Sequence, residues 1–212
     1  MRLRNRSSYS CCNIKTRTTK PDTAMKKSII LLIISIVALC IPVQAQHLKF
    51  MEIPLTGSIT QFQSKLQAKG VKYDKETSNL FPAGTRVFDG VFAGEKAKIY
   101  VYYDPSSKTV YRAKAVVTCE TASICESKYQ EFKSLLSTKY NCFEQVSEQD
   151  GHECNTYVIA KDNPTSMDDI IGGITLYVST SDFIYPIEQY LHIDYNDYQN
   201  SLKSEEGKMK DL

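Results

Sequence analysis

The stretch between Arg86 and Val117 constrains the fold most, because apolar and polar residues alternate through three successive segments separated by turn residues. Alternation with a period of two is typical of strands that have one buried face and one wet face. The stretch therefore predicts a three-stranded antiparallel meander. Its expected strands are 86–93, 96–103 and 108–119.

Two amphipathic helices flank this meander. The first is expected to begin at Ser58 as its N-cap and to end at Gly70, and the second is expected from about Ala122 to Lys139. Apolar residues at helical spacing mark the buried side of each helix. They are Ile59, Phe62 and Leu66 in the first helix and Tyr129, Phe132, Leu136 and Tyr140 in the second.

The order of a helix followed by strands occurs twice along the chain. Residues 61–69 (QFQSKLQAK) share Phe, Ser, Leu and Lys with residues 131–139 (EFKSLLSTK) at an offset of 70. Farther along, Ile99-Tyr100-Val101 resembles Leu176-Tyr177-Val178 at an offset of 77, and an insertion within 161–173 accounts for the shift. The alternative is chance similarity between two amphipathic helices.

This pattern predicts an α+β domain at 46–196, built from two repeats at about 57–118 and 122–195. Each repeat is expected to hold a helix and about four antiparallel strands, in a pseudo-twofold arrangement with the helices packed on one sheet face. In the second repeat, Gly172-Gly173 is expected to be a loop hinge, and Pro186 reduces 183–188 to an edge strand or loop. Residues 197–212 are expected to form a loose polar tail.

The first 45 residues are interpreted as targeting sequence. Residues 25–45 combine Met25-Lys26-Lys27, an apolar run at 29–41 and a small final residue, which is the pattern of a secretory signal peptide. The run is shorter than the roughly 20 residues that span a bilayer. A membrane anchor and lipid attachment at Cys40 are the alternatives. Residues 1–24 are interpreted as a mis-assigned extension. Because residues 25–45 have the pattern of a signal peptide, the expected location is periplasmic or secreted.

Removal of residues 1–45 reverses the sign of the net charge. These residues hold 8 of the 26 Lys and Arg and 1 of the 24 Asp and Glu, which leaves 18 basic and 23 acidic residues and a net charge of −5. Affinity for nucleic acid comes mainly from neutralising phosphates, so nucleic acid is not an expected partner. No integral membrane segment is expected after signal cleavage. The expected partner is a protein or a cell-envelope ligand.

Four cysteines remain after cleavage: Cys119, Cys125, Cys142 and Cys154. An even number in an exported chain favours disulfides. Of the three possible pairings, we predict Cys119–Cys125 together with Cys142–Cys154. The spacings contain no C-x2-C knuckle, so we expect no zinc site. The sequence also lacks a Gly-rich phosphate loop, so we expect no cofactor.

The histidines do not form a recognisable catalytic group. His47 lies in an N-terminal stretch that is expected to be flexible, and His152 lies in a turn near Cys154 without a third orienting residue. His192 and Asp194 lie on the same face of a predicted strand, and they keep a periplasmic or secreted hydrolase as an alternative function. Neither G-x-S-x-G nor H-E-x-x-H is present, so we do not expect an enzyme.

Tyrosines carry the remaining functional signal. Tyr100 and Tyr102 lie opposite the face of Ile99 and Val101, and Arg112 and Lys114 alternate in the same way on the next predicted strand. Aromatic side chains are common in interfaces because they supply a large rigid area with a polar tip. Tyr100, Tyr102, Arg112 and Lys114 are therefore the predicted ligand-binding residues. The alternative is that the rings pair across strands and only stabilise the sheet.

The function expected from these patterns is an exported, non-catalytic binding protein that recognises its ligand through an aromatic sheet face. A structural envelope component is a further alternative. Residues 50–57 (FMEIPLTG) and 85–94 (TRVFDGVFAG) resemble a group of small exported proteins from gut-type anaerobic bacteria, which implies export but no particular activity. The duplicated layout is similar to the tandem domain of β-lactamase-inhibitor proteins, and by analogy of fold alone it implies binding of a partner on a concave sheet.

Overall fold

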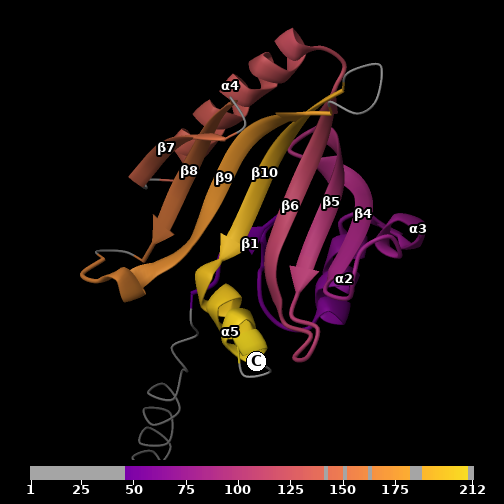
Figure 1. Cartoon of the computed structure of the whole chain (residues 1–212), viewed down its shortest axis with the longest axis vertical. Helices are drawn as coiled ribbons and strands as arrows, with labels where there is room; N and C mark the ends of the chain where they lie inside the picture. Colours follow the sequence, from indigo (N-terminus) through magenta and orange to yellow (C-terminus); the bar gives the residue numbers. More distant parts are fainter. Residues whose placement is uncertain (1–45, 141–142, 150–151, 162–163, 182–187, 210–212) are drawn as a thin grey trace, which may run out of the picture. The chain divides into compact units, whose positions relative to one another are not determined.

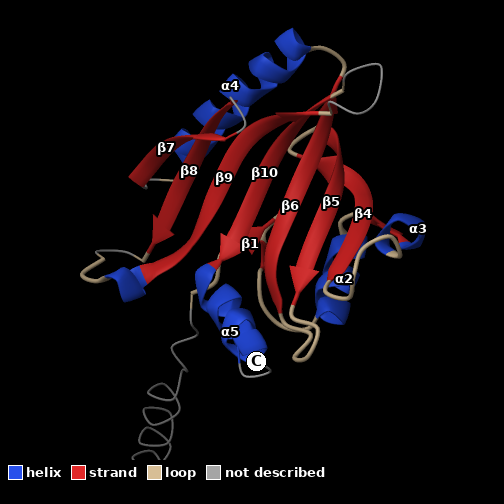
Figure 2. Cartoon of the chain, in the orientation of Figure 1, coloured by secondary structure: helices blue, strands red, loops and turns tan. Residues whose placement is uncertain are grey.

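The computed structural model describes residues 46–140, 143–149, 152–161, 164–181 and 188–209. All of them belong to one compact unit, Ala45–Leu212. Within the described residues the fold is α+β, with a large antiparallel sheet and four α-helices (Figure 1, Figure 2). The predicted extension 1–24, the predicted signal peptide 25–45 and Cys142 lie outside the described residues.

The main sheet has eight strands in the order β3-β4-β5-β6-β10-β9-β8-β7, and every neighbouring pair is antiparallel. The meander predicted from the alternating pattern is confirmed as β4, β5 and β6. The strands are β3 (Lys72–Asp74), β4 (Thr85–Phe92), β5 (Glu95–Tyr103), β6 (Val110–Cys119), β7 (Phe143–Gln149), β8 (His152–Ala160), β9 (Ile170–Thr180) and β10 (Gln189–Asp197).

The two predicted helices are confirmed, the first of them together with its predicted ends. Helix α2 (Ile59–Ala68) begins after Ser58, whose side chain accepts a hydrogen bond from the Gln61 backbone N–H at 3.3 Å. It ends before Gly70, which adopts a left-handed φ of 84° that glycine permits at low cost. Helix α4 (Ala122–Lys139) begins after Thr121, which caps the Ile124 backbone N–H. Helix α3 (Lys75–Ser78) is a short turn after β3.

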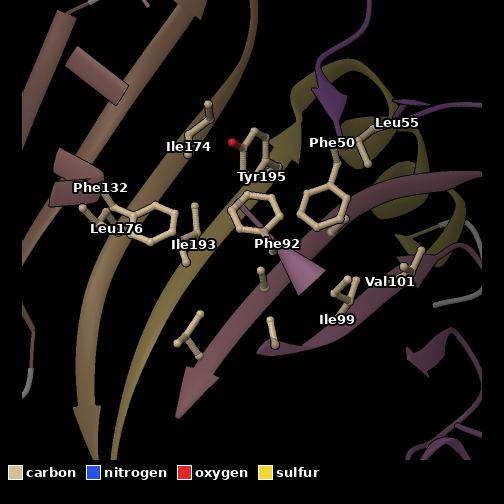
Figure 3. Packing of buried hydrophobic residues seen from close by; sticks show 14 of the residues in the cluster. Phe50, Leu55, Phe92, Ile99, Val101, Phe132, Ile174, Leu176, Ile193 and Tyr195 are labelled. Carbon is tan, nitrogen blue, oxygen red and sulfur yellow. The ribbon is translucent and has the colours of Figure 1, made fainter. Parts of the chain in front are cut away.

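Helices α2 and α4 cover one face of the sheet, and the structure decides which face that is. The apolar sides predicted for both helices are buried against Ile99 and Val101 of β5 and against Leu191 and Ile193 of β10. Figure 3 shows part of this core, in which Phe132 of α4 lies close to Phe92 of β4. Tyr100 and Tyr102 alternate with Ile99 and Val101 along β5, so they point to the other face. Helices α2 and α4 leave that face uncovered (Figure 1).

The N-terminal stretch is held in place, so the expected flexibility around His47 is wrong. Strands β1 (Lys49–Phe50) and β2 (Ile53–Pro54) form a small hairpin, and the Phe50 ring is fully buried and stacked on Phe92 with 5.2 Å between ring centroids. Ahead of the hairpin, His47 Nδ1 and the Leu48 backbone N–H each donate to Asp197 Oδ2 at 3.0 Å. A carboxylate about 150 residues away therefore fixes the start of the domain.

The C-terminal segment is not a loose tail. Residues Tyr198–Met209 form helix α5, which contacts β6, β9 and β10. Its inner side is polar: Asn200 Nδ2 donates to the Leu55 carbonyl at 2.8 Å, and Ser204 Oγ donates to Asp104 Oδ2 at 3.1 Å. Because these buried contacts are hydrogen bonds and not apolar packing, hydropathy periodicity could not predict the helix.

One expectation for the second half of the sheet is also wrong. Gly172 and Gly173 lie inside β9 and do not form a loop hinge. The edge of the sheet is β7, a mostly polar strand without an alternating pattern, paired with β8. The segment proposed as an edge strand or loop, 183–188, lies outside the described residues except for Glu188.

Candidate functional site on the uncovered sheet face

The four predicted ligand-binding residues lie together on the uncovered face. In the β5–β6 register, Tyr100 is opposite Lys114 and Tyr102 is opposite Arg112. Each cation lies over its neighbouring ring, with 5.5 Å from Lys114 Nζ to the Tyr100 centroid and 4.9 Å from the Arg112 guanidinium to the Tyr102 centroid. Cation–π contacts of this kind hold a cation and a ring in fixed relative positions.

Asp194 of β10 fixes the Arg112 side chain in place. Arg112 Nε donates to both carboxylate oxygens of Asp194, at 2.8 and 3.1 Å, and Arg112 Nη2 also donates to Asp194 Oδ2. This ion pair with the buried carboxylate raises the pKa of Arg112 above its usual value. A guanidinium held by such paired hydrogen bonds keeps its planar orientation, so Arg112 is oriented before any ligand arrives.

His192 occupies the next part of the face. Its ring stacks on Tyr177 of β9 with 4.4 Å between centroids and an interplanar angle of 2°, and its Nε2 lies 2.7 Å from Ser179 Oγ. Its other nitrogen, Nδ1, is buried and has no hydrogen-bond partner among the described residues. Burial, reinforced by the nearby charge of Lys114, lowers the pKa of His192 to about 4, so the imidazole is neutral at pH 7.

We call this group the aromatic–cationic strip. It crosses the four central strands β5, β6, β10 and β9, a width of about 14 Å at the usual strand spacing. Asp194 is buried and the other members are half-buried. The strip consists of Tyr100, Tyr102, Arg112, Lys114, Tyr177, His192 and Asp194.

Sequence reasoning found four of these residues as binding candidates and named His192 and Asp194 only under the hydrolase alternative. The alternation of Leu191, Ile193 and Tyr195 was enough to place His192 and Asp194 on one face. It did not show that β10 pairs with β6, because β10 lies about 80 residues farther along the chain. The role of Tyr177 depends on a different pairing, that of β9 with β10.

For the hydrolase alternative, the described contacts include a hydrogen bond between Ser179 and His192 but no carboxylate that orients the imidazole of His192. Asp194 accepts hydrogen bonds from Arg112, while His192 contacts Ser179 through Nε2. In a Ser–His–Asp arrangement the carboxylate would bind the second imidazole nitrogen and hold the tautomer. Here no described residue occupies that position at His192 Nδ1.

The cysteines depart from the predicted pairing. Cys119, at the end of β6, and Cys125, in the first turns of α4, are buried free thiols, so the predicted Cys119–Cys125 bridge is not formed in this structure. The two thiols are nevertheless hydrogen-bonded neighbours. Burial raises the pKa of Cys125 to about 12, and the hydrogen bond with Cys119 contributes to the same shift. Cys154 is buried in β8, and the predicted Cys142–Cys154 bridge cannot be followed because Cys142 is outside the described residues.

Two kinds of feature are absent from the described ranges. No three His, Cys, Asp or Glu side chains gather there in a way that would hold a metal ion. The helices described are too short or too polar for any of them to cross a membrane.

We expect the lowered pKa of His192 to make stability depend on pH. The unfolded imidazole takes up a proton near pH 6.5 and the folded one only near pH 4, so the unfolded state binds more protons between these values. The stability is present above pH 6.5 and falls with decreasing pH, by about 2 kcal/mol between pH 7 and pH 5. Urea unfolding of the wild type and of His192→Gln across this range measures the effect.

The variant separates this contribution from that of the carboxylates, which titrate in both proteins. The expected result is that His192→Gln loses less stability than the wild type between pH 7 and pH 5. Equal slopes in the two proteins would show that the folded His192 titrates normally.

Comparisons with protein-family models, with curated proteins and with solved structures find no match to this chain.

Proposed function

We propose that this protein is an exported, non-catalytic binding protein that holds a protein or cell-envelope ligand on the aromatic–cationic strip. The observation that carries the proposal is the position of the strip: aromatic and cationic side chains fill the centre of the one sheet face that α2 and α4 leave uncovered. The opposite face packs into the hydrophobic core. The proposal of export comes from the signal-peptide pattern in residues 25–45.

The composition of the strip favours recognition of another molecule. Tyrosine and arginine are enriched among the residues that dominate binding energy, because they combine large contact area with hydrogen-bonding capacity. Phe81, which is 40% exposed, adds a further ring beside Tyr100, with 5.7 Å between centroids. Together these side chains provide apolar area and donors on a single surface.

The strip is also pre-organised. Arg112 is held by Asp194, the Tyr177 ring is stacked on His192, and Lys114 lies over Tyr100. Side chains that are already ordered lose less conformational entropy on binding. This is an arrangement suited to binding a preformed ligand surface.

Charge and hydrogen bonding indicate the chemistry of the ligand. Arg112 and Lys114 outnumber the single acid Asp194, which is already paired with Arg112. The orphaned His192 Nδ1 lacks a partner that a ligand or a water molecule would supply. We therefore propose a ligand that presents acidic groups next to flat apolar area.

We also propose that the sheet arose by duplication of a helix-plus-four-strand unit. The order β3-β4-β5-β6 runs from one edge to the centre, and β7-β8-β9-β10 runs from the other edge to the centre, so the two inner strands β6 and β10 pair. A helix precedes each set, α2 before the first and α4 before the second. This repeated order supports the two repeats proposed at about 57–118 and 122–195. It also places the strip at the junction between them.

The test is capture of partners from the envelope and culture fluid of the producing cell, with the purified protein as bait and mass spectrometry to identify what is bound. A single saturable partner is the expected result. The double variant Tyr100→Ala/Tyr102→Ala is then expected to bind that partner at least about tenfold more weakly, since a loss of 1.4 kcal/mol gives that factor.

Tyr111→Ala is the matched control. Tyr111 is also a half-buried tyrosine and precedes Arg112 on β6, but it lies at an irregularity in the β5–β6 register, pairs with no residue of β5 and is not a member of the strip. Its replacement is expected to leave binding unchanged. If the double variant binds as tightly as Tyr111→Ala, the ligand does not use the strip.

The Ser179–His192 hydrogen bond keeps hydrolysis as a second candidate. A hydrolase would lose its activity in both Ser179→Ala and His192→Ala while circular dichroism shows an intact fold. Retention of any hydrolytic activity in both variants would remove this candidate.

A further inference from the structure

The helix-covered side of the sheet contains a cavity of about 600 Å³ that is distinct from the strip. It opens beside the C-terminal half of α4 and is bounded by the β1–β2 hairpin, the β4–β5 turn and the end of α2. Its volume lies within the range of about 300–1,000 Å³ that is usual for small-molecule sites.

The inner wall of the cavity is aromatic. The ring of Phe92 stacks on Phe132 at 6.2 Å and meets the Tyr195 ring edge-to-face at the same distance, and all three side chains are buried (Figure 3). Burial raises the pKa of Tyr195 far above its usual value, so its phenol is uncharged. The wall therefore offers an apolar surface without charge.

The mouth of the cavity is positively charged. Lys49, Lys69 and Lys139 line it together with one acid, Glu52. Lys139 Nζ lies 3.3 Å from Glu52 Oε1, so these two charges compensate each other. Neither Lys49 nor Lys69 forms an ion pair with any residue that the structure describes, which leaves two exposed ammonium groups at the entrance.

Two tight turns form part of this boundary. Met51, Glu52 and Ala93 adopt left-handed φ values of 49°, 62° and 49°, and they are three of the four non-glycine residues with positive φ in the described part of the chain. All three line the cavity. Met51-Glu52 and Ala93-Gly94 are the two-residue loops of the β1–β2 and β4–β5 hairpins, and tight hairpin turns of this kind require positive φ at both central positions. The two hairpins therefore fix the shape of this side of the cavity.

We propose that this cavity binds a long-chain fatty acid, with the acyl chain against the aromatic wall and the carboxylate at Lys49 and Lys69. An uncharged apolar interior suits the chain, and two unpaired ammonium groups at the entrance suit one anionic head. A neutral lipid would leave these lysines without a counter-charge, and a cationic one would be repelled by them. The site lies on the opposite side of the sheet from the strip, so this proposal stands or fails independently of the proposed function.

The first experiment titrates the purified protein with the fluorescent fatty acid cis-parinaric acid and displaces it with competitors. Palmitate is expected to displace the probe completely. Methyl palmitate, which keeps the chain and loses the charge, is expected to compete about fivefold less well, and hexadecyltrimethylammonium less well still. Acetate, which has the head alone, is expected to have no effect.

A pair of matched leucine variants places the binding in this cavity. Leu135 on α4 lines the cavity and is 52% exposed, whereas Leu202 on α5 is 59% exposed and lies outside it. Leu135→Trp fills the mouth and is expected to weaken probe binding at least about tenfold, while Leu202→Trp leaves it unchanged. Because both side chains are exposed, neither variant is expected to unfold the protein.

A pair of charge variants tests the head group. Lys49→Gln/Lys69→Gln is expected to weaken palmitate about fivefold and methyl palmitate hardly at all, because two partly solvated ion pairs are lost. Lys65→Gln/Lys72→Gln removes the same charge from exposed lysines outside the cavity and is expected to change neither.

Four results would overturn the proposal: no saturable probe binding, binding that Leu135→Trp leaves unchanged, equal displacement by the cationic amphiphile, or displacement by phospholipid vesicles but not by monomeric palmitate. The last result would indicate a membrane surface as the ligand. Size-exclusion chromatography tests whether a second copy of the chain occupies this region instead. If the protein is a dimer that Leu135→Trp dissociates, and if it binds no fatty acid, the region is an interface between copies.

Discussion

Replacing Asp197 with alanine is expected to destabilise the protein by about 4 kcal/mol, a large part of the stability of a single domain. The Asp197 side chain is completely buried at the end of β10. Its Oδ2 accepts hydrogen bonds from the Leu48 backbone N–H and His47 Nδ1, and its Oδ1 accepts one from the Asn200 backbone N–H, all at 3.0 Å.

The size of the expected effect follows from what the alanine would leave behind. Two buried backbone N–H groups, those of Leu48 and Asn200, would lose their acceptor without access to water, at about 1–3 kcal/mol each. The carboxylate also joins the N-terminal hairpin to the start of α5. The variant should therefore loosen both ends of the domain together.

Urea unfolding of Asp197→Ala measures this loss, with Asp168→Ala as the matched control. Asp168 is exposed and its side chain makes no hydrogen bond to another described residue, so its replacement is expected to change stability by less than about 0.5 kcal/mol. A loss below about 1 kcal/mol for Asp197→Ala would show that the three contacts are not formed in solution.

Replacing Gly172 with alanine is expected to destabilise the protein by at least about 3 kcal/mol through a steric clash. A Cβ atom at this position would overlap the Asn196 carbonyl oxygen and would lie 3.2 Å from the carbonyl carbon and 3.3 Å from Asp197 Cα. These are backbone atoms of β10, held by the β9–β10 ladder, so they cannot move aside as a flexible side chain would.

Gly207→Ala is the control, and it is expected to act in the opposite direction. A Cβ atom at Gly207 meets nothing within 4 Å, and the residue lies in α5. Alanine there should stabilise the helix by about 0.5–1 kcal/mol. Thermal unfolding of both variants decides the matter: similar stabilities would contradict the close approach of β10 to Gly172, and a destabilising Gly207→Ala would contradict the helix.

The local elements of this protein follow from local sequence patterns. Alternating residues predicted β4 to β6. Helical spacing predicted α2 and α4, with Ser58 and Gly70 at the ends of α2, because caps and periodicity act over a few neighbouring residues. The same alternation put Tyr100 and Tyr102 on one face. It could not say whether that face is covered by helices, since either face of a sheet can receive them.

The elements that the sequence concealed are those stabilised by buried polar contacts or by distant partners. Helix α5 buries Asn200 and Ser204, and β7 is a polar edge strand, so neither has an apolar stripe. The two glycines of β9 suggested a loop because the residues packed against them are distant in sequence: the end of β10 lies against Gly172, and Tyr198 of α5 lies against Gly173. Composition and spacing carry no information about such pairings.

The sequence by itself determined the α+β class, the central strands, the two long helices and the four side chains predicted to bind a ligand. Only the tertiary structure decided that β10 pairs with β6, which brings Asp194 to Arg112, and with β9, which brings His192 to Tyr177. It likewise decided that α4, α2 and the N-terminal hairpin enclose a lysine-rimmed cavity. The physical reason is range: caps and alternation are set by neighbours along the chain, whereas a site is built from side chains that only the packed core brings together.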